Sequence, residues 1–159
     1  MVSIKLIAFD QSTTATGWCV MDYHTSEIID YGTLEPKGET NSRIRDTVKA
    51  AIGLCDIHQP TFVFMEGVQY QKNAVVFQVL AKLAGILEIV LEEKGYIVNV
   101  VKAPEWRKRV GIKSRRRKEL KAEAIAMVEE LYGIKACEDE CEAILFARAF
   151  CDNPKEEET

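Results

Sequence analysis

Residues 74–91 form the longest apolar stretch, and they limit most strongly what this chain can fold into. Of these eighteen residues, fourteen are apolar and one is glycine. The three polar ones are Gln78, Lys82 and Glu88. A membrane span rarely carries two charges, so Lys82 and Glu88 argue against one. We expect instead a helix of a folded domain over residues 73–94, which Gly95 ends. It is apolar almost all round, so a second copy of the chain in a two-fold dimer, or else the C-terminal helices, must cover its outer face.

The order of the remaining apolar runs predicts an α/β fold. Strands are expected at residues 3–9, 16–23, 27–34, 61–65 and 96–101, and helices at 41–55, 73–94, from Pro104, 118–132 and 137–150. Short polar connections join the first three strands, which predicts an antiparallel meander. We expect one domain over residues 1–151 and an acidic, frayed tail over 152–159.

Charge is distributed unevenly along the chain, although the net charge is only −4. Between Lys102 and Lys121 there are ten Lys or Arg residues against two Glu, whereas residues 122–159 hold eleven acids against three bases. A basic block within an acidic chain indicates a polyanion contact on one surface. The alternative is a solvated helix face followed by a loop.

The cysteines and the N-terminus predict a cytoplasmic protein. The five cysteines form no Cys-x-x-Cys pair, and the first residues, MVSIKLIAFD, follow a strand pattern and not that of a signal peptide. Cys137 and Cys141 lie four residues apart without a second pair or a histidine, which disfavours a zinc site. We therefore expect reduced thiols, no membrane segment and no structural zinc.

Four acidic residues are the candidate catalytic groups. Asp10 and Glu66 each end an apolar strand, and Asp139 and Glu142 lie three apart at the start of the last helix. If the strands that carry Asp10 and Glu66 are parallel neighbours, these two residues share one end of the sheet, where ligands gather in α/β folds. Each alone is also typical of a turn, an exposed strand end or a helix N-terminus. Together they predict a site for Mg²⁺ or Mn²⁺, which take oxygen ligands.

Two such ions can hold a phosphodiester for attack by water, which favours a nuclease. The segment from Asp10 to Gly17 is also similar to the first phosphate loop of actin-like sugar kinases. Those proteins need two large lobes and a second glycine-rich loop, and this sequence has neither, so we disfavour a kinase.

Three motifs in order resemble the RuvC-type Holliday junction resolvases of the ribonuclease H-like superfamily. They are IAFDQSTTATGW, EGVQYQKNAVVFQVLAKLAG and DECEAILFARA, and the resemblance extends from about Ile4 to Phe150. Gln11 and Ser12 replace the Pro-Gly of the family's first motif, and Glu142 replaces its final Asp. Because Glu138 and Glu140 flank Asp139, the register of the last two ligands stays open.

The resemblance implies a ribonuclease H-like five-stranded mixed sheet flanked by helices. It also implies a homodimer through helix 73–94 that resolves four-way DNA junctions, and other branched DNA as well, by paired symmetric nicks. Asp10, Glu66, Asp139 and Glu142 would be both catalytic and metal-binding, with two Mg²⁺ per site and Mn²⁺ as a substitute. The expected DNA-binding residues are Gln69, Tyr70, Lys72, Asn73, Lys113, Arg115, Arg116, Arg117, Lys118 and Lys121.

Within the family, the long basic run indicates a phage-like or divergent member, in the cytoplasm of a bacterium or of a phage-infected cell. Two other functions remain open at this point. One is a catalytically inactive module of the same fold that binds junctions. The other is a monomeric nuclease of the same superfamily that makes no symmetric cuts.

Overall fold

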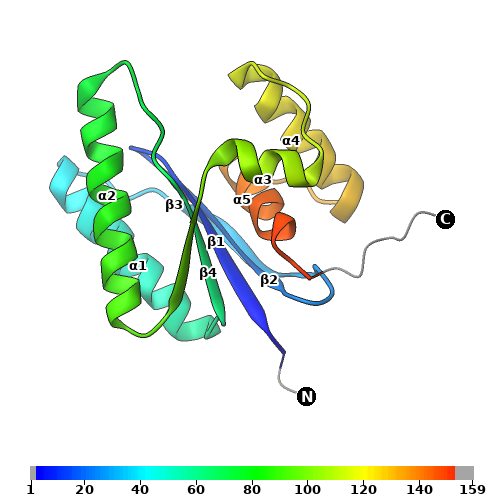
Figure 1. Cartoon of the computed structure of the whole chain (residues 1–159), viewed down its shortest axis with the longest axis horizontal. Helices are drawn as coiled ribbons and strands as arrows, with labels where there is room; N and C mark the ends of the chain where they lie inside the picture. Colours follow the sequence, from blue (N-terminus) through cyan, green and yellow to red (C-terminus); the bar gives the residue numbers. More distant parts are fainter. Residues whose placement is uncertain (1–2, 153–159) are drawn as a thin grey trace.

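The computed structural model describes residues 3–152, which form one five-stranded sheet with helices on both faces (Figure 1). The strands are β1 (Lys5–Gln11), β2 (Thr16–Asp22), β3 (Ile28–Leu34), β4 (Phe62–Glu66) and β5 (Ile97–Val101). The helices are α1 (Thr40–His58), α2 (Ala74–Glu93), α3 (Ala103–Val110), α4 (Arg117–Tyr132) and α5 (Glu138–Ala149). The five strands and the order of the helices are those expected from the sequence.

The sheet has the order β3-β2-β1-β4-β5 and is mixed. β2 pairs antiparallel with both β1 and β3, which confirms the meander, whereas β4 is parallel to β1 and β5 is parallel to β4. Because β1 and β4 run in the same direction, Asp10 and Glu66 lie at the same edge of the sheet. This pairing is the condition on which the expected carboxylate site depended.

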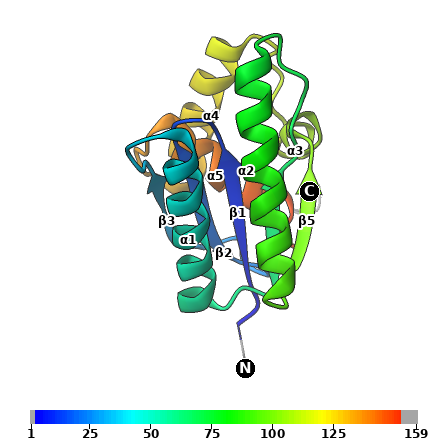
Figure 2. The same cartoon turned by 90° about the vertical axis from the view of Figure 1, so that its left-hand side faces the viewer.

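The molecule has three layers, with α1 and α2 on one face of the sheet and α3, α4 and α5 on the other (Figures 1 and 2). An apolar core lies between the sheet and each helical layer. Side chains alternate between the faces of a strand, so Ile7 and Phe9 pack under α1 and α2, whereas Leu6 and Ala8 pack under the helices of the other face. There α5 lies directly on β1 and β2, and α3 and α4 pack against α5. The same alternation turns the side chain of Asp10 toward α5.

Helix α2 buries one apolar face and exposes another. Its buried residues are Leu83, Ala84, Leu87 and Leu91, while Val75, Ile86 and Ile89 are 68%, 38% and 54% exposed. The C-terminal helices pack on the opposite face of the sheet from α2. The alternative expectation, that these helices bury the outer face of α2, is therefore wrong. Among the described residues, α2 alone is long and apolar enough to span a membrane, a weak criterion that the core helices of soluble proteins also meet.

The boundaries differ from expectation where pairing or capping extends an element. β1 continues past Phe9 to Gln11, and β4 includes Glu66, because these residues still pair with neighbouring strands. α1 runs on to His58, where Gln59 adopts a left-handed conformation and ends the helix. All five cysteines are free thiols. Of the expected acidic tail, only Asp152 lies within the described residues, and its amide donates to the carbonyl of Tyr23 (2.8 Å).

Candidate active site

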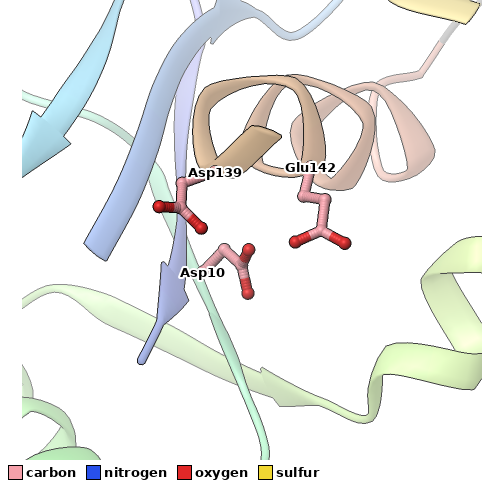
Figure 3. A group of neighbouring side chains, drawn as sticks. All are labelled: Asp10, Asp139 and Glu142. Atoms are coloured by element: carbon pink, nitrogen blue, oxygen red, sulfur yellow. The ribbon is translucent and has the colours of Figure 1, made fainter. Parts of the chain in front are cut away.

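The N-terminal turn of α5 brings two acidic side chains against the end of β1. Carboxylate oxygens of Asp10, Asp139 and Glu142 all lie within 4.8 Å of one another. In Figure 3, the Asp10 side chain extends from β1 toward the two carboxylates on α5. Glu142 is 9% exposed and is the one charged residue that is buried among residues 3–152. Residues more than 120 positions apart in the sequence thus share one site.

Gly17 allows this close approach of α5 to the sheet. It lies on β2 directly opposite Asp10. A Cβ atom at this position would overlap the backbone carbonyl group of Asp139. Any larger residue would therefore push the N-terminus of α5, and the carboxylates it carries, away from Asp10.

Glu66 completes the set from the end of β4. Its Oε2 accepts a hydrogen bond from Nε1 of Trp106 (3.2 Å), and this fully buried indole stacks on Phe146 in the core. Glu66 lies outside the group of three mutually close carboxylates, but it lines the same hollow of about 480 Å³. We call Asp10, Glu66, Asp139 and Glu142 the carboxylate cluster.

Burial and the repulsion of neighbouring carboxylates raise the pKa values of Asp10, Glu66 and Asp139. Burial raises the pKa of Asp10 well above its ordinary value, and the charges of Glu66 and Glu142 raise it further. Burial also raises the pKa of Glu66, although hydrogen bonds to its carboxylate oppose that rise. The pKa of Asp139 is raised by burial and then by the charge of Glu142. Negative charges are therefore held together here at a cost in free energy.

This donor set fits a divalent cation. All its ligand atoms are carboxylate oxygens, which Mg²⁺ and Mn²⁺ prefer, and three of the side chains are close enough to share an ion. A bound cation would also favour the ionised forms that burial and repulsion disfavour. Chemically, a metal is the simplest way to relieve the repulsion that the fold builds in.

The other two acids at the start of α5 have different partners. Oε2 of Glu138 pairs with Nζ of Lys121 at 2.8 Å. Oε1 of Glu140 accepts from the amide of Cys137 (3.1 Å) and so caps its own helix. The register that the sequence left open therefore has Asp139 and Glu142 in the cluster.

A basic loop lies beside the carboxylate cluster. We call its residues the basic rim: Lys113, Arg115, Arg116, Arg117 and Lys118. The rim is exposed, and Arg115 and Arg117 line the hollow together with Lys121. Glu123 on α4 anchors the loop, because its carboxylate accepts from the amides of Lys113 and Ser114 (3.0 Å) and from the Ser114 hydroxyl (2.9 Å).

The segment between β4 and α2 carries the other expected DNA-binding residues. Gln69 lines the hollow, whereas Tyr70 is 83% exposed and Lys72 is exposed as well. Asn73 is the N-cap of α2, and its Oδ1 accepts from the amides of Val75 (3.0 Å) and Val76 (3.2 Å). The side-chain oxygen of Asn73 therefore has a structural role that the sequence reading did not assign to it.

The sequence reading did not single out Arg107 or Trp106. Arg107 lines the hollow, with its Nη2 3.8 Å from Oε1 of Glu142, and its buried Nε has no hydrogen-bond partner among residues 3–152. It also lines a second groove of about 690 Å³, which shares Arg115 with the hollow. Both residues lie in the basic stretch, but nothing in their spacing marks them as neighbours of a carboxylate.

The five-stranded mixed sheet and the helices on its two faces form a fold that solved structures of nucleases share. Among solved structures, Thermus thermophilus RuvC in complex with a Holliday junction substrate is similar, with a TM-score of 0.73 and 12% identity over 92% of this chain and 91% of that one. A Fowlpox virus resolvase in complex with substrate Holliday junction DNA gives a TM-score of 0.64 and 13% identity, covering 92% of this chain and 96% of that one.

The yeast mitochondrial Holliday junction resolvase Ydc2 has a TM-score of 0.62 and 13% identity, covering 93% of this chain and 78% of that one. No family model matches the chain, and no curated protein sequence matches it. The chain therefore has the RuvC-type, ribonuclease H-like fold that its motifs indicated. At these identities the likeness lies in the fold, and the function has to be argued from the site.

Proposed function

We propose that this protein is a metal-dependent, structure-selective DNA endonuclease that resolves four-way junctions. The observation that carries the proposal is the convergence of three carboxylates within 4.8 Å, with Glu66 in the same hollow and arginines at its border. The fold it shares with solved Holliday junction resolvases supports a junction as the substrate. Its nicks would leave 5′-phosphate and 3′-hydroxyl ends, which can be ligated.

Each part of the site has a task in this reaction. Asp10, Glu66, Asp139 and Glu142 would hold two Mg²⁺, or Mn²⁺ in their place. Bound ions would activate water and stabilise the leaving oxygen. Trp106 orients Glu66, and Gly17 lets α5 bring its carboxylates close. No covalent intermediate on the protein is needed.

The basic residues would hold the DNA backbone over the carboxylate cluster. Arg115, Arg117 and Lys121 line the hollow, and the second groove continues from it past Arg107 and Lys113. Such contacts fix the position of a phosphate chain and its affinity, but they read no sequence. Gln69 and Tyr70 are the candidates for contacts near the centre of the junction.

A homodimer through α2 would supply the second active site for a paired cut. Val75 and Ile86 are eleven residues apart, about three helical turns, so they lie on one face of α2, with Ile89 beside them. An exposed apolar face of this kind, in addition to the face that packs on the sheet, fits a second copy of the chain. The double substitution Ile86→Glu and Ile89→Glu should give monomers that nick but no longer cut both strands together, as the solution mass and the nick pattern would record.

The direct test is to incubate the protein with a mobile four-way junction, a Y-fork and a duplex, with Mg²⁺ and with EDTA, and to map every nick. We expect symmetric nicks in opposing strands of the junction, in Mg²⁺ only. Binding without cleavage would indicate an inactive junction-binding module. Cleavage of the fork without symmetric nicks, by a protein whose mass in solution is that of a monomer, would indicate a different nuclease of the same fold.

A further inference from the structure

At the end of β1, the side chain of Gln11 forms the hydrogen bonds to β4 that a strand backbone would otherwise form. Its Nε2 donates to the carbonyl oxygen of Glu66 (2.9 Å), and its Oε1 accepts from the amide of Glu66 (2.9 Å). One side-chain amide therefore satisfies both backbone groups of a residue in the carboxylate cluster. The two residues are 55 positions apart, and both hydrogen bonds are partly buried.

This double hydrogen bond lies where the backbone ladder stops. The parallel pairing of β1 with β4 ends at Phe9 and Met65, one residue before Asp10 and Glu66. Beyond that point β1 continues beside β2, where Gln11 pairs with Thr16. The backbone groups of Glu66 that point toward β1 would be left without a partner there, and unpaired groups of this kind are costly when buried.

We propose that Gln11 is a positioning residue, which locks the backbone of Glu66 in register with Asp10 and so sets the spacing of the carboxylates across β1 and β4. The inference rests on the proposed function, since it assigns the lock to the metal site of that nuclease. Gln11 is also a position where the sequence departs from the resolvase motif, which has proline there. A proline has no side-chain amide to form these bonds.

The geometry requires both ends of a glutamine amide. Methionine has a similar length but forms neither hydrogen bond, and asparagine is one methylene too short to keep both. Gln11→Met is therefore the main test variant and Gln11→Asn the second. Lys49→Met, at an exposed position on α1, introduces the same methionine away from the site and from the proposed dimer face, and is the control for stability.

Hydrogen exchange tests the lock without metal or DNA. In the metal-free protein, Gln11→Met should lower the protection of the Glu66 amide by about tenfold or more, while the amides of Val63 and Met65 keep theirs. Unchanged protection of Glu66 would overturn the proposal. A uniform loss along β4 would also overturn it, because that result is a general loss of stability.

Metal titration tests the consequence for the site. In both test variants the Mg²⁺ concentration for half-maximal junction cleavage should rise by about 10-fold to 100-fold, with junction binding in EDTA unchanged. An unchanged Mg²⁺ midpoint would overturn the proposal and leave the nuclease assignment intact.

If the wild type cleaves nothing, the proposed function fails separately, and the rise in melting temperature with Mn²⁺ replaces cleavage as the readout. A smaller rise in Gln11→Met than in wild type supports the lock, and an equal rise, or none in wild type, overturns it.

Discussion

The carboxylate cluster and the basic rim lie side by side but are built in opposite ways. The cluster residues project from two neighbouring strands and a core helix, and the core tryptophan Trp106 holds one of them. Rim residues lie on an exposed loop and the first turn of α4, and a single carboxylate, Glu123, anchors that loop. The cluster is fixed by tertiary structure, whereas the rim is a local feature of the chain.

This difference predicts how each region responds to substitution. Metal ligands act together at fixed positions, so one change in the cluster should remove a large share of activity. Phosphate contacts on an exposed, solvated surface are nearly interchangeable, so a change in the rim should be graded and depend on salt. The predictions below test this contrast, in order of decreasing effect.

Asp10→Asn should have the largest effect. It removes a proposed metal ligand without changing the shape of the side chain, so cleavage should fall by roughly 10³-fold, or ~4 kcal/mol of transition-state stabilisation. Junction binding should be preserved or tightened, because a negative charge is lost. Single-turnover cleavage and gel-shift assays measure the two effects. Asp46→Asn, at an exposed position of α1, is the control, and full activity of Asp10→Asn in Mg²⁺ would refute the metal site.

Gly17→Ala tests whether the cluster depends on the approach of α5 to β2. The added methyl group overlaps the carbonyl of Asp139, so α5 must shift, at a cost of about 1–3 kcal/mol in stability. We expect cleavage to fall by about 10²-fold, since a displacement of about 1 Å at a reacting site costs that much. Cleavage and thermal melts report the two effects.

Gly53→Ala is the control for that substitution. Its methyl group would enter open space on α1, so it should leave cleavage unchanged and stabilise the helix by about 0.5–1 kcal/mol. Equal behaviour of the two variants would mean that Gly17 does not set the position of α5.

Replacing Arg115, Arg116 and Arg117 together with Ala should weaken binding in a graded way. Each lost phosphate contact lowers the slope of log K against log salt by about 0.9, so the triple variant should lose up to about 2.7 of that slope. The loss should be equal for junctions of different sequence. Binding isotherms at several salt concentrations measure it. The triple Ala variant of Arg45, Lys49 and Lys94, which are exposed elsewhere, removes the same charge and should bind normally.

Metal removal should produce the smallest effect, in stability. A cation at about ten times its dissociation constant stabilises a protein by about 1.4 kcal/mol, or roughly 3–6 °C in melting temperature at this size. The raised pKa of Asp10 means that its ionised form destabilises the metal-free protein at neutral pH, an effect relieved as the pH falls through that pKa. In EDTA at pH 7, Asp10→Asn should therefore melt above the wild type and gain little from Mg²⁺. Wild-type melting that is insensitive to Mg²⁺ would contradict the proposed site.

Local patterns in the sequence were enough to predict most of the secondary structure and the candidate residues. The apolar runs that end at Asp10 and Glu66 identify strands, because a short apolar run bounded by polar residues is typical of a strand buried within a sheet. The helix over residues 73–94 is equally clear from composition, and the structure gives it as Ala74–Glu93 after an Asn73 cap. The ordered motifs also indicated the fold that the solved resolvases share with this chain.

Only the tertiary structure decided which chemical groups meet. Three contacts join residues that are at least 40 positions apart in the sequence. They are the close approach of Gly17 to Asp139, the hydrogen bond from Trp106 to Glu66, and the hydrogen bonds of the Gln11 side-chain amide to the Glu66 backbone. The choice of Asp139 and Glu142 over their acidic neighbours also depends on partners elsewhere, such as Lys121 for Glu138. Sequence patterns report the face on which a residue lies, but contacts between elements depend on how those faces pack, which is a property of the whole fold.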